Sequence, residues 1–214
     1  MPNWVSTTLS VKGSLEEVQR FIDGVTDSKI LQSYVPCPEE LQNTVAGYLG
    51  ADKEEEHRKQ QASNIAKYGH KDWYDWAYDE WGSKWGDCDT NFGTLLKTVT
   101  GSWEVVIQYQ TAWSCADTGF LKVSQMFPSL YFTFDYDEEA GFFSGLHVFH
   151  NGDIIFESMY EPCNYPHPVD WDDCESVDKY DEWKAKHSDM IHDEYVLFMA
   201  DKHYTNSDQK EEPF

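Results

Sequence analysis

Arginine is almost absent from this chain: Arg20 and Arg58 are the two arginines among 214 residues. Arginine is the usual bidentate partner of phosphate groups, and phosphate neutralisation supplies most of the affinity of proteins for nucleic acids. The chain is therefore poorly equipped to hold DNA, RNA or a nucleotide through direct contacts. We expect no direct nucleic-acid ligand.

Long apolar runs are also missing. No stretch approaches the roughly eighteen apolar residues of a membrane-spanning helix, so we expect no membrane segment. The first residues contain no basic stretch followed by an apolar one, so we expect no signal peptide. The cysteines are odd in number and form no Cys-x-x-Cys pair, which indicates reduced thiols in a cytoplasm. They are Cys37, Cys88, Cys115, Cys163 and Cys174.

The motifs of common enzyme classes are absent too. The chain has no Gly-x-Ser-x-Gly, no P-loop and no Gly-x-Gly-x-x-Gly. Asp75, Asp79 and Glu80 have the spacing of paired glycosidase carboxylates, but any acidic helix satisfies that spacing. His187 and His192, with the acids beside them, lack the ligand spacing of a zinc site. We therefore predict no catalytic residue, no metal and no cofactor.

What the chain has in excess is negative charge. Asp and Glu number 39 against 16 Lys and Arg, which gives a net charge of −23. Residues 160–214 contain fifteen of the acidic and five of the basic residues. One interpretation is solubility and repulsion between molecules. The other is that the acid is directed at a basic partner, and the composition leaves both open.

Apolar periodicity predicts the fold class. Ser14 and Glu17 form a capping box that begins a helix, and Asn151-Gly152 is a strong hairpin signal. The expected elements are a strand (3–12), a helix (14–25), a strand (102–113), a short helix (114–128) and three antiparallel strands (129–160). This order predicts an α+β fold: a ferredoxin-like antiparallel sheet with helices on one face.

Two segments lie outside this pattern. About residues 30–100 form a predicted helical insertion, which contains the Trp-rich stretch "DWYDWAYDEWGSKWGD". Residues 160–214 combine prolines, acid and helical spacing, and we predict an acidic, partly helical C-terminal extension. The predicted domains are therefore 1–159, ferredoxin-like, and 160–214. Dimerisation of two copies through the sheet stays open.

Four short motifs carry a resemblance. They are "MPNWVSTTLSVKG" at the start, "VPCPEEL", "YGHKDWYDWAYDEWGSKWGD" and "TAWSCAD". Together they resemble the YubB-type ferredoxin-like family of phage- and plasmid-encoded proteins over about residues 1–158. Val5, Ser83 and Cys115 depart from the usual family residues. The resemblance implies the fold, a mobile-element origin and hence a host cytoplasm. It implies no assigned reaction, so no catalytic residue is carried over.

The extension contains the predicted partner-binding residues. Acid interleaved with aromatic side chains suits a surface that occupies a basic, aromatic-lined groove built for nucleic acid, because aromatics supply anchoring energy and charge supplies association rate. The residues are Asp170, Trp171, Asp172, Asp173, Glu175, Asp178, Tyr180, Asp181, Glu182 and Trp183. A solvated helix face is the equally weighted structural interpretation.

A second candidate site lies around the two glycines of "WGSKWG". Trp81, Lys84 and Trp85, with Trp113 as a further wall, can form a pocket in which indoles stack on a ligand and one cation holds an anion. The structural interpretation is an irregular connector whose indoles fill the edge of the fold, and for Trp113 a core position.

The first functional hypothesis is a non-enzymatic phage or mobile-element protein that inhibits a basic host protein, such as a nucleic-acid-binding anti-phage defence factor. DNA mimicry is its more specific version. The alternative hypothesis is a small-ligand-binding or enzymatic ferredoxin-like domain with its pocket at residues 81–85.

Overall fold

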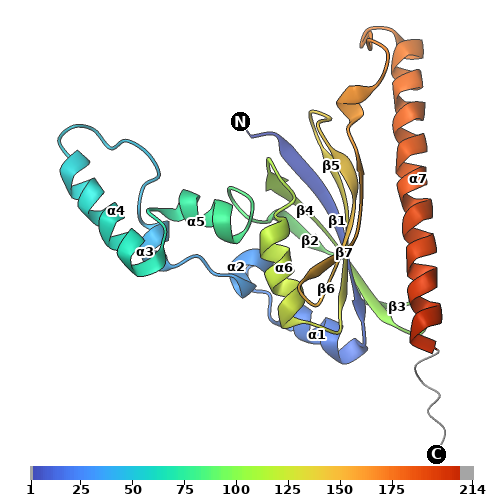
Figure 1. Cartoon of the computed structure of the whole chain (residues 1–214), viewed down its shortest axis with the longest axis horizontal. Helices are drawn as coiled ribbons and strands as arrows, with labels where there is room; N and C mark the ends of the chain where they lie inside the picture. Colours follow the sequence, from blue (N-terminus) through green and yellow to red (C-terminus); the bar gives the residue numbers. More distant parts are fainter. Residues whose placement is uncertain (1, 208–214) are drawn as a thin grey trace, which may run out of the picture.

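The computed structural model describes the backbone of residues 2–207 and the side chains of residues 2–201. Seven strands of this region form one antiparallel sheet in the order β2–β4–β1–β5–β6–β7, with β3 also paired to β4 (Figure 1). The strands are β1 (Trp4–Gly13), β2 (Cys88–Phe92), β3 (Leu96–Lys97), β4 (Trp103–Ala112), β5 (Tyr131–Glu138), β6 (Ser144–His150) and β7 (Asp153–Tyr160).

One face of the sheet carries the main core. Alternate residues of β1, among them Val5, Leu9 and Val11, are fully buried, as expected when successive side chains point to opposite faces. α1 (Leu15–Asp23) and α6 (Asp117–Met126) lie on this face, at the left of the sheet in Figure 1. The ferredoxin-like α+β fold predicted from the apolar pattern is therefore confirmed.

The local signals act as expected. Glu17 donates its backbone N–H to the Ser14 hydroxyl at 3.3 Å, which caps α1. Asn151 and Gly152 have φ values of 50° and 85° and form the turn between β6 and β7. Positive φ at both central residues is what a tight hairpin of this kind requires.

The C-terminal extension lies on the opposite face of the sheet. Its main element is one continuous helix, α7 (Cys174–Ser207), which packs on β6 and β7 (Figure 1). Leu146 and Val148 of β6 and Ile191 of α7 are buried together in a second, smaller core. Helices thus cover one face of residues 1–159, as predicted, and the extension adds a helix to the other face.

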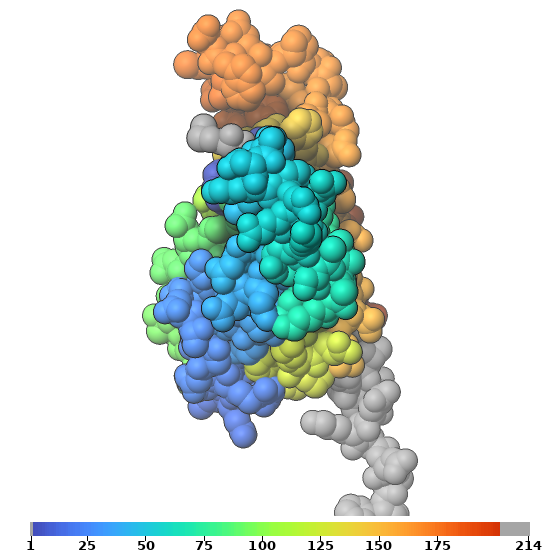
Figure 2. All heavy atoms as spheres, turned by 90° about the vertical axis from the view of Figure 1, so that its left-hand side faces the viewer, coloured from blue at the N-terminus to red at the C-terminus, as the bar shows by residue number. Residues whose placement is uncertain are grey.

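The insertion forms an arm of helices that projects from the sheet (Figure 1), and Figure 2 looks onto this arm, coloured from blue through cyan to teal. Its helices are α2 (Ile30–Tyr34), α3 (Glu39–Gln42), α4 (Glu54–Tyr68) and α5 (Trp73–Glu80). α4 ends at Gly69, whose φ of 80° is the left-handed cap conformation. The predicted helical span of 30–100 is too long, because residues 88–97 form β2 and β3. Asn91 and Phe92 pair with Gln108 and Ile107 of β4 and extend the sheet.

Candidate functional site

The outer surface of the extension is strongly acidic. Every carboxylate between residues 170 and 201 is exposed. Among the described residues, two α7 lysines form ion pairs here: Lys179 pairs with Glu175 at 2.8 Å, and Lys184 pairs with Asp137 of β5 at 3.2 Å. We call this set the acidic face: Asp170, Asp172, Asp173, Glu175, Asp178, Asp181, Glu182, Asp189, Asp193, Glu194 and Asp201.

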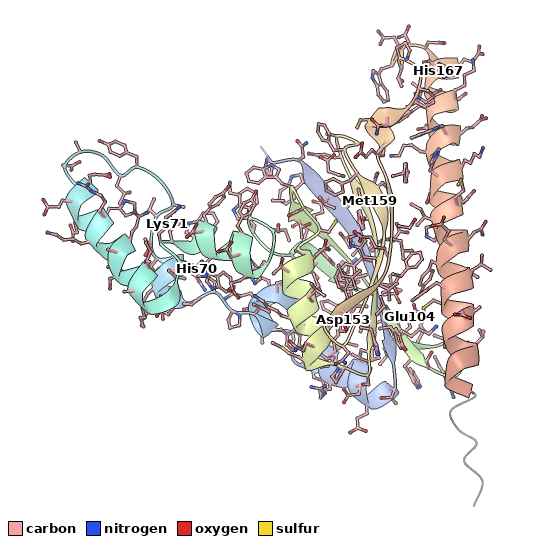
Figure 3. All side chains as sticks on the ribbon, viewed as in Figure 1. His70, Lys71, Glu104, Asp153, Met159 and His167 are labelled. Atoms are coloured by element: carbon pink, nitrogen blue, oxygen red, sulfur yellow. The ribbon has the colours of Figure 1, made fainter. Side chains whose placement is uncertain are left out.

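The aromatic side chains of the extension are mostly half-buried and pack against one another and against β7. The ring of Trp183 lies 5.8 Å from that of Tyr160 and 5.5 Å from that of Tyr165, and Tyr165 is 5.4 Å from Tyr180. These contacts hold the connector that follows β7, which Figure 3 marks at His167 near the N-terminal end of α7. Of the three aromatic residues predicted to contact a partner, Trp171 is the most exposed, at 68%.

A polar groove continues the acidic face onto the sheet. Asp135 and Asp137 of β5 contact α7 through His192 (3.1 Å) and Lys184. The same two carboxylates line a groove of about 640 Å³ on the half of the sheet that α7 leaves uncovered. Its other lining residues are Ser6, Thr7, Thr8, Asp89, Asn91, Gln108, Tyr109, Gln110 and Tyr136. No lysine or arginine lines the groove itself, and Lys184 of α7 pairs with Asp137 at its edge, so the groove extends the negative surface with little opposing charge.

The second candidate site begins where α5 ends. Trp81 is buried, and its indole N–H donates to the Val35 carbonyl at 2.8 Å, so it serves as a fixed wall. Gly82 and Gly86 have φ values of 76° and 69°, which favour glycine. A Cβ on Gly86 would also lie 3.3 Å from the Trp81 ring. These two turns bring the chain back past Trp81 and place the intervening residues beside it.

Lys84 lies between aromatic rings. Its Nζ is 4.5 Å from the ring centre of Trp85, 4.8 Å from that of Trp113 and 5.7 Å from that of Tyr74. Trp85 and Trp113 are 39% and 38% exposed. Trp113 reaches this position through a φ of 70° and a hydrogen bond from its N–H to the Asn3 carbonyl at 2.9 Å. The structure thus brings Lys84, Trp85 and Trp113 together, and Trp113 is not a core residue.

A cavity of about 320 Å³ adjoins Lys84. We call it the indole cleft, and its lining residues are Gln32, Cys37, Gln42, Trp73, Trp81, Lys84 and Trp85. A neighbouring hollow of about 210 Å³ shares four of these residues and reaches Lys29 and Asp87. Sequence reasoning missed the two glutamines and Lys29, because they come from α2, its N-cap and α3, about forty to fifty residues before Trp81. No local pattern marks them.

A buried polar cluster lies beneath α6, on the main-core face. His147 of β6 bonds the Tyr136 hydroxyl at 2.8 Å, and its Nδ1 lies 3.4 Å from Asp117. Burial raises the pKa of the Tyr136 hydroxyl and of the nearby Cys115 thiol well above their ordinary values. Both groups therefore stay protonated at neutral pH, which makes Cys115 a poor nucleophile.

The described residues show two further features. No helix among them is long and apolar enough to span a bilayer. No three of their His, Cys, Asp or Glu side chains are arranged to hold a metal ion. α7 has the length for a span, but acidic residues occur along it.

Comparisons with known proteins found one family model and one solved structure that are similar to this chain. A family model described as the ferredoxin-like domain in Api92-like protein matches residues 80–177. Among solved structures, the protein Api92 from Yersinia pseudotuberculosis is similar, with 10% sequence identity and a TM-score of 0.45 over 75% of this chain and 98% of that one. No curated protein matches the chain. The family match supports the ferredoxin-like fold and names no reaction, ligand or partner.

Proposed function

We propose that this chain is a non-enzymatic inhibitor that binds a basic partner protein through the acidic face. The observation that carries the proposal is the orientation of α7. Ile191 faces the sheet and is buried, while the carboxylates of the same helix all lie in solvent. The second core therefore holds α7, with its negatively charged outer surface, on the sheet.

Electrostatics supports a role in association. A surface with one sign of charge speeds the encounter with an oppositely charged partner and excludes partners of like charge. Lys179 and Lys184 are held in ion pairs, so they neutralise few of the carboxylates. Both pairs are exposed enough that solvent weakens them. The expected signature is affinity that falls as salt is added.

The number of exposed carboxylates on α7 can be compared with the number of phosphates on a DNA duplex of the same length. α7 carries eight exposed carboxylates between Glu175 and Asp201, about 40 Å of helix at the usual rise per residue. Duplex DNA of that length carries about 24 phosphates. The acidic face therefore presents about a third of the charge of a duplex. It is a partial mimic, suited to one basic patch rather than to a whole DNA-binding groove.

The origin and location of the partner follow from the resemblance. The YubB-type motifs are typical of phage and plasmid proteins, and inhibitors carried by such elements meet the proteins of the host cytoplasm. A nucleic-acid-binding defence factor has the basic surface that the acidic face complements. We therefore propose that the partner is a defence factor of this kind.

Two charge-matched variants test the proposal. One replaces Asp178, Glu182, Asp189 and Asp193 of α7 by the corresponding amides. The control replaces Asp27, Glu39, Asp52 and Glu56, exposed acids of the arm and of the turn that precedes it, in the same way. Capture of host proteins from lysate is compared at low and high salt, and inhibition is measured with the purified partner.

The proposal predicts that the α7 variant loses the captured partner and its inhibition, while the control retains both. Equal losses in the two variants would mean that net charge, and not this surface, governs association.

A second candidate function is the binding of a small ligand in the indole cleft. The observation that favours it is the exposed pair Trp85 and Trp113 around an ammonium group, next to a cavity of 320 Å³. This volume lies at the lower end of the range of small-molecule sites.

A further inference from the structure

We infer that the indole cleft binds a small aromatic anion: a planar ring system that carries one carboxylate or sulfonate group. The inference rests on the second candidate function, and it is independent of the acidic face. The cleft is lined by residues of α2, α3, α5 and the turn after α5, and these helices lie on the side of the sheet opposite α7 (Figure 1).

The walls of the cleft suit a planar ring. Trp73, Trp81 and Trp85 line it, and aromatic rings associate well in stacked and edge-to-face arrangements. Trp81 is fixed by its hydrogen bond to Val35, and the ring of Trp85 is supported by Trp4 at 5.8 Å. The walls are therefore largely ordered before a ligand arrives, which reduces the entropy lost on binding.

The charge at the cleft is positive, against the trend of the whole chain. Among the described residues, no carboxylate lies within ion-pair distance of Lys84, whose ammonium is held by ring faces. Such cation–π contact leaves the N–H groups able to donate to an anion. Lys29 adds a second ammonium at the adjoining hollow.

The one carboxylate at the adjoining hollow is already engaged. Asp87 is buried and accepts hydrogen bonds from the backbone N–H groups of Ile30 and Leu31 and from the Thr90 hydroxyl, each at 2.8 Å. It therefore fixes the start of α2 and is poorly placed to pair with a lysine or a cationic ligand. No other carboxylate lines the cleft or the hollow, so an anion meets little local repulsion here despite the net charge of −23.

The cleft also offers polar contacts for orientation. Gln42 donates its amide N–H to the Cys37 carbonyl at 2.7 Å, which fixes its side chain and leaves its oxygen toward the surroundings. Gln32 has no hydrogen-bond partner among the described side chains, so its amide is available to a ligand. Burial raises the pKa of the Cys37 thiol to about 11, so this thiol stays protonated and the site binds without covalent chemistry.

The test uses three probes of similar size: 2-naphthoate, the neutral 2-naphthamide and the saturated decahydro-2-naphthoate. Binding to the full chain is measured by calorimetry and ligand-observed NMR. We expect 2-naphthoate to bind at least about tenfold more tightly than the other two, because only it supplies both the ring and the charge. Equal binding of the amide, or no binding of 2-naphthoate at millimolar concentration, would overturn the inference.

Variants locate the site. Lys84→Met keeps the aliphatic stem and removes the charge, and Trp85→Leu removes one wall. We expect each to weaken 2-naphthoate binding about tenfold with the circular dichroism spectrum unchanged. Lys186→Met and Trp171→Leu, exposed positions of the extension, are the matched controls and should leave the affinity unchanged. If the controls weaken binding as much as the cleft variants, the probe binds elsewhere.

Salt separates this inference from the proposed function. Lys84 attracts the probe at short range and the negative net charge of the chain repels it at long range. Salt screens both effects, so 2-naphthoate affinity should change little between 20 and about 200 mM salt. Binding through the acidic face should fall over the same range. The α7 amide variant should retain 2-naphthoate binding, so either site can fail without the other.

Discussion

The placement of the acidic face depends on Ile191, and its truncation gives the sharpest stability prediction. Ile191 is 6% exposed and packs on Leu146 and Val148 in the second core. Ile191→Ala removes three carbon groups, each worth about 0.8 kcal/mol when buried, and leaves a cavity. The ion pairs of α7 with Asp135 and Asp137 are exposed and contribute about 0–1 kcal/mol each. We therefore expect undocking of α7 to become easier by about 2–3 kcal/mol.

Hydrogen exchange measures this undocking. A change of 2–3 kcal/mol corresponds to roughly 30- to 150-fold faster exchange of α7 amides through local opening, with β1 and β4 much less affected. The matched control is Val196→Ala on the same helix, since Val196 is 61% exposed and surface changes stay within about 0.5 kcal/mol. Unchanged α7 exchange in Ile191→Ala, or a uniform increase across the sheet, would refute the reasoning that the second core holds α7 as a separate unit.

Three further predictions concern single groups. Asp87→Ala leaves two backbone N–H groups of α2 without acceptors, and we expect the free energy of unfolding in urea to fall by about 2–4 kcal/mol. Burial raises the pKa of Cys37 to about 11, so at pH 8 a thiol reagent should label exposed Cys163 quickly and Cys37 only after unfolding. The hydrogen bond from Lys67 lowers the Glu40 pKa to about 2, so its contribution to stability is full above about pH 4.5 and is lost as the pH falls toward 2. In the Lys67→Met variant, we expect the Glu40 pKa, measured by NMR titration, to lie closer to its ordinary value.

Local chemistry accounts for the parts of the fold that the sequence predicts. The alternation of β1 places Val5, Leu9 and Val11 on one face whatever they contact, because a strand has a period of two. Asn151-Gly152 adopts the positive φ values that few other pairs tolerate. Signals of this kind depend on residues that are close in the sequence, and the structure confirms both.

The remaining features depend on contacts between distant segments. α7 has helical spacing in its sequence, but the sheet face it covers is decided by Leu146 and Val148 on β6. β2 is short and polar, and its pairing with β4 marks it as a strand only in the assembled sheet. The indole cleft shows both cases. Lys84 and Trp85 are adjacent and were predicted together, whereas Gln32 joins them through tertiary structure.

The most direct test of the central claim is the salt dependence of partner binding through the acidic face. Affinity for the captured host protein should be measured between 50 and about 500 mM salt for the native chain, the α7 amide variant and the control variant. The account predicts a steep fall for the native chain and the control, and a clearly shallower one for the α7 variant. An affinity that does not change with salt, or three identical slopes, would contradict it.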